Sequence, residues 1–310
     1  MSEPQVLISH PMLASLQAEI EAGGLRVARG WELKDEERGS VRAIVHVGEF
    51  VLTPEYLTSL PNLGLIANVS VGYDGVDVAW CRARGIEVTH AHGLNAEDVA
   101  DHAMGLLVGG WRNIVQGDRT VRAGAWRQEN RIGPQPSLSG RKLGIVGLGH
   151  IGAAVARRAE AFRMQVSWWS PRQKPAPWPY APSLLSLARD SDILLVACRA
   201  DASSRGLIGR EVIEAVGPQG MIVNVSRGFV VDEDALVEAL KDGRLGRAAL
   251  DVFAEEPTPP ARWAELPNTV LTPHAAGSTT ESIPVMVAQA IDNVQRFLSG
   301  RPLASPVERG

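Results

Sequence analysis

Cysteine is scarce in this chain of 310 residues, where only Cys81 and Cys198 occur, far apart in the sequence. Neither belongs to a CxxC pair, so the sequence predicts neither a disulfide framework nor a zinc site built on cysteines. Isolated thiols are typical of proteins in a reducing compartment, and we therefore expect a cytoplasmic protein.

Basic clusters and long apolar runs are also missing. The formal net charge is −4 and no dense tract of lysine and arginine occurs, which argues against a nucleic-acid partner. Apolar runs such as residues 193–197 are far too short to cross a bilayer, and residues 1–6 do not open a secretion signal. The expectation is a soluble, unexported protein with no membrane partner.

Short apolar segments alternate with helical patterns over the first ~95 residues and again from about residue 140 to residue 272. This alternation predicts parallel sheets with helices on both faces. A long helical pattern over residues 95–121 is a candidate for an element that crosses between domains, although Gly109 and Gly110 weaken the expectation that it is unbroken. A last pattern over residues 280–299 is expected to pack back on the first domain.

The most informative local motif is G-x-G-x-x-G at residues 147–152, between the apolar run 143–146 and the alanine-rich helical pattern 153–161. In such a unit Gly147 permits the tight turn, Gly149 lets the backbone approach a pyrophosphate, and Gly152 lets the helix pack closely on the strand. The helix start also offers free amide groups and the positive end of its dipole. The motif predicts dinucleotide binding, with a purely structural glycine turn as the alternative.

The choice between NAD and NADP depends on the end of the next expected strand, residues 165–169. NAD-preferring units place an acidic residue there, about 20 residues after the first glycines, to bind the ribose hydroxyls. This chain has Ser170, Arg172 and Lys174 in that segment and no carboxylate. Because Ser170 and Arg172 can bind a 2′-phosphate, we predict that NADP(H) is preferred and NAD(H) possible. In the alternative, Arg172 and Lys174 are merely solvated loop charges.

Three polar residues follow later expected strands of the same sheet. Arg227 follows residues 221–225, Glu256 follows the strand that ends at residue 250, and His274 follows residues 270–272. Each could be an ordinary surface or packing residue. Ligands of open α/β sheets bind at the carboxyl ends of the strands, so the shared position of the three favours a catalytic site.

Taken together and in this order, the motifs resemble those of the D-isomer-specific 2-hydroxyacid dehydrogenases. The resemblance extends over nearly the whole chain, through residues 70–74, 97–102, 147–152, 205–209, 224–228, 250–253, 256–257 and 272–277. The sequence Asp98-Val99-Ala100-Asp101 is most similar to the glyoxylate/hydroxypyruvate and hydroxyphenylpyruvate reductase branch. The resemblance implies an α/β fold of two doubly wound, Rossmann-like domains: an NAD(P)-binding domain (95–276) inserted in a flavodoxin-like substrate domain (1–94 and 277–310).

The activity implied by the resemblance is reduction of a small 2-oxo acid to the D-2-hydroxy acid with hydride from NAD(P)H. Glyoxylate or hydroxypyruvate is the expected substrate, with hydroxyphenylpyruvate or 2-ketogluconate as alternatives. An NAD(H)-sensing, corepressor-like binding protein is the alternative from another class, and formate- or phosphite-oxidising relatives are a disfavoured third. A homodimer is implied as well, through the long helical segment and the region of Trp126.

The resemblance also assigns roles to the candidate catalytic residues. Arg227 matches the arginine that binds the substrate carboxylate and polarises the keto oxygen, a role suited to a two-pronged guanidinium. His274 matches the acid/base that protonates the nascent alkoxide. Glu256 matches the carboxylate that pairs with this histidine and favours its protonated form.

Further binding residues follow from the same resemblance. Val71 and Gly72 match a loop whose backbone N–H groups hold the substrate carboxylate, and Asp251 matches a residue near the nicotinamide carboxamide. Additional cofactor contacts are implied at His150, Ile151, Cys198, Val225 and Gly277. Residues 201–205 depart from the family pattern, which leaves the contact on the nicotinamide ribose side undetermined.

Three histidines allow a different interpretation. His90 and His92 lie two residues apart and His102 follows on an expected helix, so that a metal site is conceivable. The family chemistry requires no metal and no fourth ligand is evident, and the sequence therefore predicts none.

Overall fold

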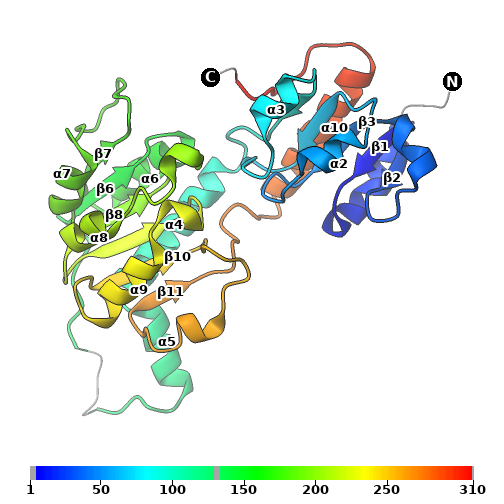
Figure 1. Cartoon of the computed structure of the whole chain (residues 1–310). Helices are drawn as coiled ribbons and strands as arrows, with labels where there is room; N and C mark the ends of the chain where they lie inside the picture. The colour runs from blue at the N-terminus through cyan, green and yellow to red at the C-terminus, as the bar shows by residue number, and fades with distance from the viewer. Residues whose placement is uncertain (1–4, 129–132, 309–310) are drawn as a thin grey trace. The chain divides into compact units, whose positions relative to one another are not determined.

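A computed structural model describes residues 5–128 and 133–308. The chain divides into two compact units: Met1–Leu94 with Thr279–Gly310, and Asn95–Ser278. Each unit contains one parallel sheet with helices on both faces, as the sequence predicts (Figure 1). The expected second boundary follows residue 276, whereas the second unit ends at Ser278.

The first unit contains a five-stranded sheet in the order β2-β1-β3-β4-β5. Its strands are β1 (Gln5–Ile8), β2 (Arg26–Arg29), β3 (Val41–His46), β4 (Leu65–Asn68) and β5 (Glu87–Thr89). Its helices are α1 (Gln17–Ala22), α2 (Pro54–Thr58), α3 (Val78–Arg82) and α10 (Ser282–Leu298), with short 3-10 turns η1 (Pro11–Leu16) and η2 (Asp35–Ser40). Strand β2 is not predicted by the apolar pattern, because at this edge of the sheet both terminal arginines are exposed.

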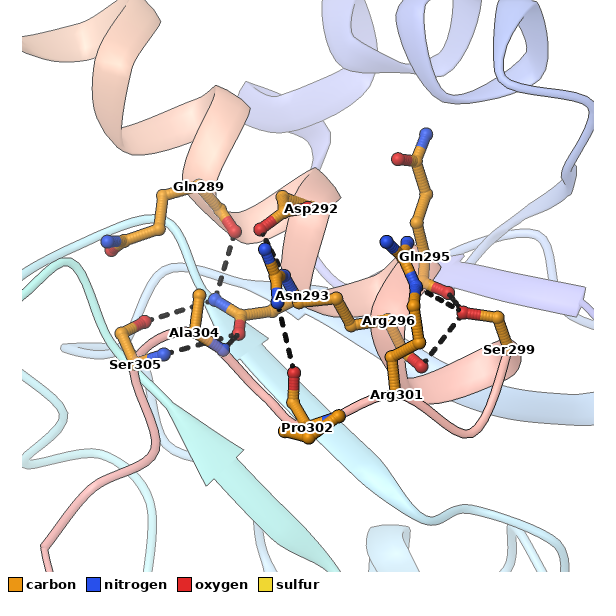
Figure 2. A network of polar contacts seen from close by, with 10 residues as sticks. All are labelled: Gln289, Asp292, Asn293, Gln295, Arg296, Ser299, Arg301, Pro302, Ala304 and Ser305. Carbon is orange, nitrogen blue, oxygen red and sulfur yellow. Dashed lines mark hydrogen bonds and ion pairs between the residues drawn. The ribbon is translucent and has the colours of Figure 1, made fainter.

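Helix α10 confirms the expectation that the last helical pattern packs on the first unit. It contacts β3 and β4, and its apolar stripe of Val287, Ile291 and Val294 is buried in the same core as the strand residues. The buried Asn293 then binds the chain that follows: its side chain accepts from the Ala304 N–H at 2.8 Å and donates to Ser305 Oγ at 3.0 Å (Figure 2). The C-terminal segment is thereby attached to α10.

The second unit contains a six-stranded sheet in the order β11-β10-β9-β8-β6-β7. Its strands are β6 (Lys142–Val146), β7 (Gln165–Trp169), β8 (Ile193–Val196), β9 (Met221–Asn224), β10 (Arg247–Leu250) and β11 (Thr269–Leu271). The strand order reverses at β6, which has β7 on one side and β8 on the other. Such a switch point opens a crevice at the carboxyl ends of the strands, where ligands of this sheet class bind.

Helices cover both faces of this second sheet. One face bears α4 (Ala96–Trp111) and α6 (His150–Ala161), and the other bears α7 (Leu184–Arg189), α8 (Arg210–Val216) and α9 (Glu233–Lys241). The remaining elements are α5 (Ile114–Arg122) and the 3-10 turns η3 (Ala202–Ser204), η4 (Gly228–Val230) and η5 (Pro260–Arg262). No helix within the described residues is long and apolar enough to span a membrane.

The helical pattern over residues 95–121 forms two helices, and the break does not fall at the two glycines. Gly109 and Gly110 remain inside α4, and a Cβ at Gly110 would lie 2.5 Å from Met221 Cε of the sheet. The chain breaks instead at Asn113, whose φ of 52° is left-handed. Helix α4 contacts α6, β9, β10 and β11, so it belongs to the second unit and is not a crossing element.

Candidate active site

A cavity of about 330 Å³ lies at the carboxyl ends of β6, β7 and β8, at the switch point of the second sheet. It is lined by the residues that follow these three strands and by the turn η3: 147–149, 169–171, 174, 197–199, 201, 203, 204 and 207. Its position is the one expected for a dinucleotide in a sheet of this topology.

Each of the three glycines of the motif has its own structural role: a tight turn, an open backbone for a phosphate, or close packing of the helix on the strand. Gly147 has a φ of 91°, and a Cβ there would lie 2.4 Å from Cys198 Cα. A Cβ at Gly152 would lie 2.1 Å from the Gly147 carbonyl oxygen, so this glycine lets α6 pack on the strand. Gly149 caps α6, and a Cβ there would meet open space. The open backbone beside a helix N-terminus fits a phosphate pair.

The other cofactor residues expected from the sequence lie in several elements of the second unit. His150 and Ile151 begin α6, and Val225 follows β9 and is buried. Cys198 lines the cavity, and burial raises the pKa of its thiol to about 11, so it forms a neutral wall. Gly277 packs against the start of α4, where a Cβ would lie 2.3 Å from Asn95 Nδ2.

The loop after β7 differs in detail from the sequence expectation. Among the described residues, Ser170 and Lys174 line the cavity and the exposed Arg172 does not. The Ser170 hydroxyl donates to the Arg172 carbonyl at 2.6 Å, which uses its proton within the turn. Lys174 is therefore the cation of this loop that lines the cavity, and the binding of a 2′-phosphate by Arg172 stays a prediction.

Glu256 and His274 form a direct pair. His274 Nδ1 lies 2.7 Å from Glu256 Oε2, and the Phe253 N–H donates to Glu256 Oε1 at 2.9 Å. Burial alone would raise the pKa of Glu256, but the hydrogen bonds from His274 and Phe253 and the charges of His274 and Arg227 outweigh burial and lower it. The carboxylate is thus held ionised next to the imidazole, with the guanidinium of Arg227 near enough to act on it.

Arg227 is placed by a turn that fits closely against the loop carrying Glu256. Asn224 Nδ2 donates to the Arg227 carbonyl at 3.0 Å, and Arg227 Nη1 donates to the Ser226 carbonyl at 2.9 Å. A Cβ on the next residue, Gly228, would lie 1.8 Å from the Phe253 carbonyl carbon, so only glycine permits this approach. The ends of β9 and β10 are brought together in this way.

His274 has a strained backbone that its neighbours hold in place. Its φ of 51° lies in the left-handed region, and its N–H donates to the Asp251 carbonyl at 2.8 Å. The carboxylate of Asp251, which is 1% exposed, accepts from the N–H groups of Ala275 and Ala276, each at 2.9 Å, and from Thr272 Oγ1 at 2.5 Å. Asp251 therefore organises the loop of His274, and its contact with a nicotinamide carboxamide stays a prediction.

Val71 and Gly72 belong to the first unit and lie in the loop after β4. His90 Nδ1 donates to the Val71 carbonyl at 3.0 Å, and Ser70 Oγ donates to the Gly72 carbonyl at 2.8 Å. Within residues 5–128 and 133–308, the N–H groups of Val71 and Gly72 have no acceptor. Two anchored carbonyls and two free amides suit the binding of an anion.

The histidines considered as metal ligands lie in different units. His90 and His92 are in the first unit, with ring centroids 5.1 Å apart, whereas His102 lies on α4 of the second unit and contacts Thr272. In the described part of the chain, no group of three or more histidine, cysteine or acidic side chains is arranged to hold a metal ion.

The strand order and the glycine cradle define a dinucleotide-binding α/β protein of the Rossmann class. Comparison with known families makes the class specific: the NAD binding domain of the D-isomer specific 2-hydroxyacid dehydrogenases matches residues 104–276. The chain belongs to the D-isomer-specific 2-hydroxyacid dehydrogenase family, as its motifs predict. It is an oxidoreductase that uses a nicotinamide cofactor.

Individual relatives match over nearly their full length. The chain is 38% identical to glyoxylate/hydroxypyruvate reductase A of Arabidopsis thaliana, over 97% of this chain and 98% of that protein. It is 39% identical to hydroxyphenylpyruvate reductase of Plectranthus scutellarioides, with the same coverage. Among solved structures, an NADPH-dependent glyoxylate/hydroxypyruvate reductase from Sinorhizobium meliloti, in complex with NADP and malonate, superposes with a TM-score of 0.90 at 34% identity over 100% of both chains.

Proposed function

We propose that this protein reduces a small 2-oxo acid, of the glyoxylate or hydroxypyruvate type, to the D-2-hydroxy acid, with NADPH preferred over NADH. The observation that carries the proposal is the His274–Glu256 pair, 2.7 Å apart, with the charge of Arg227 acting on the same carboxylate. These groups follow strands of the sheet whose switch point holds the glycine turn and the cavity. An acid, an anion-binding cation and a cofactor cradle are the parts that carbonyl reduction requires.

The residues divide the work of the reaction. Arg227 binds the carboxylate of the 2-oxo acid and polarises its keto oxygen, because its guanidinium can donate two parallel hydrogen bonds. His274 is paired through Nδ1 with Glu256, and in its protonated form it donates its other ring proton to the oxygen that becomes the hydroxyl. When bound, the reduced nicotinamide supplies the hydride.

The loop after β4 is a further candidate for binding the substrate carboxylate. The free N–H groups of Val71 and Gly72 support our proposal that they bind the substrate carboxylate. The anchored carbonyls of the same residues keep these amides in place for an anion.

The substrate class is tested by following NADPH oxidation with a panel of 2-oxo acids: glyoxylate, hydroxypyruvate, pyruvate, hydroxyphenylpyruvate, phenylpyruvate and 2-ketogluconate. We expect the highest kcat/KM with glyoxylate or hydroxypyruvate. A preference for hydroxyphenylpyruvate or 2-ketogluconate would support the proposed type of reaction but contradict the proposed substrate. Tight NADH or NADPH binding without turnover of any acid would instead indicate a nucleotide-sensing binding protein.

The pairing of Glu256 with His274 predicts a specific pH dependence. Reduction needs protonated His274, so the reductive kcat/KM is constant at low pH and falls as pH rises through the pKa of the pair, while oxidation of the hydroxy acid rises through the same range. Glu256→Gln removes the charge that favours the imidazolium. The fall of the reductive kcat/KM should therefore occur at lower pH in this variant. Glu255→Gln, at the exposed neighbouring acid, is the matched control. If the reductive kcat/KM of Glu256→Gln fell at the same pH as that of the parent, the pairing would be contradicted.

Cofactor choice is expected to depend on Ser170 and Lys174. Losing a charged partner of a phosphate typically removes about 1.5–3 kcal/mol, so Lys174→Ala should lower kcat/KM for NADPH by roughly 10- to 100-fold with little change for NADH. The exposed Arg172→Ala should have the smaller effect, and Ser170→Asp with Arg172→Ala should shift preference toward NADH. Equal use of both cofactors by the parent would show that this loop does not discriminate between them.

A homodimer in the cytoplasm is part of the same proposal. Helix α5 carries Ile114 and Val121 seven positions apart, on one face, and they are 55% and 59% exposed. Trp126, which follows the helix, is 63% exposed. An apolar surface of this kind is typical of a subunit interface.

A further inference from the structure

His102 lies in the middle of α4 and has no part in the reaction as described above. Its Nε2 is 2.9 Å from Thr272 Oγ1 and 3.4 Å from Asp251 Oδ1, and its side chain is 27% exposed. Thr272 and Asp251 are the residues that hold the loop of His274. His102 of α4 thus contacts the residues that hold the proposed acid, His274, in place.

The direction of these hydrogen bonds follows from the number of protons. The Thr272 hydroxyl has one proton, which it donates to Asp251 Oδ1 at 2.5 Å, because a carboxylate can only accept. Thr272 Oγ1 must then accept from His102, whose Nε2 carries a proton. The chain of donors runs from His102 through Thr272 to Asp251.

Asp251 connects these hydrogen bonds to the backbone of His274. Its carboxylate also accepts from the N–H groups of Ala275 and Ala276, and its carbonyl accepts from the His274 N–H. A histidine with a left-handed φ of 51° persists only where several neighbours determine its backbone. His102 is the donor at the far end of that set of contacts.

We propose that His102 is a positioning residue for His274, acting through Thr272 and Asp251 to hold the imidazole in line with Glu256. The expected effect on catalysis rests on the proposed function. The structural link between His102 and His274 rests on the geometry alone. A displacement of about 1 Å in a reacting group can cost roughly 10²-fold in rate, so a modest loosening of this loop is measurable.

The first test compares His102→Leu with His102→Gln, because the glutamine amide can place an N–H near the position of Nε2. We expect His102→Leu to lower kcat for reduction by roughly 10- to 100-fold, with the Kd for NADPH within about twofold of the parent. His102→Gln should recover most of the loss. A Leu variant with unchanged kcat, or a Gln variant as impaired as Leu at the same Tm, would overturn the proposal.

Thr272→Val and the double variant His102→Leu with Thr272→Val test whether His102 acts through Thr272. If His102 acts through Thr272, the double variant should lose no more activity than the more impaired single variant, whereas independent roles would make the losses multiply. Multiplying losses would contradict the chain of donors.

A readout without turnover separates this proposal from the proposed function. The seven histidines can be labelled and followed by NMR, with the signal of His274 assigned from a His274→Gln variant. We expect the His274 signal to move in His102→Leu and to return toward its parent position in His102→Gln. A parent that turns over no 2-oxo acid would end the proposed function and leave this test intact, while an unmoved His274 signal would end the inference alone.

Discussion

Replacing His274 by glutamine is expected to lower kcat for 2-oxo acid reduction by about 10³-fold, within the range that general acid catalysis supplies. Glutamine can still contact Glu256 but cannot deliver a proton at neutral pH, so the reaction would depend on water. The Kd for NADPH should stay within about twofold, because His274 is not part of the glycine cradle.

The measurement is single-turnover reduction together with a fluorescence titration of NADPH. Glu255→Gln, at the exposed acid beside the pair, is the control and should remain close to the parent. A His274→Gln variant that kept more than about a tenth of the parent kcat would contradict the assignment of the acid.

Replacing Arg227 by alanine is expected to reduce kcat/KM by at least ~10²-fold, through both substrate binding and turnover. The substrate carboxylate would lose its two-pronged partner, and the keto oxygen would lose a positive charge beside it. Arg227→Lys should recover only part of the loss, because an ammonium is a point charge without the planar fork.

Arg189→Ala, at the exposed end of α7, provides the control for removing one positive charge from this unit. It should leave kcat/KM close to the parent value. If Arg227→Ala were also within a few-fold of the parent, Arg227 would be an ordinary surface residue and the proposed substrate site would be wrong.

Much of the fold follows from signals that are local in the sequence. The strand, glycine turn and helix of residues 143–161 are adjacent, so the pattern alone places the cofactor cradle at the end of β6. The carboxyl ends of the strands in a parallel sheet share one edge, and for this reason the sequence alone groups Arg227, Glu256 and His274. The pair of Glu256 and His274 is then seen directly, at 2.7 Å.

The parts that the sequence could not predict depend on contacts between distant residues. The sequence of residues 170–174 does not predict that Lys174 and not Arg172 lines the cavity, because this depends on the path of the loop after β7. The contact between His102 and Thr272 joins residues 170 positions apart. Strand β2 lacks an apolar run because it lies at the edge of its sheet.

We propose that the protein converts a 2-oxo acid to a hydroxy acid of D configuration and oxidises a reduced nicotinamide in the same reaction. Incubation of the purified protein with hydroxypyruvate and NADPH, followed by chiral chromatography of the product, tests it most directly. We predict one molecule of D-glycerate for each NADPH oxidised, with no L-glycerate. NADPH oxidation without glycerate, or a racemic or L product, would contradict the account.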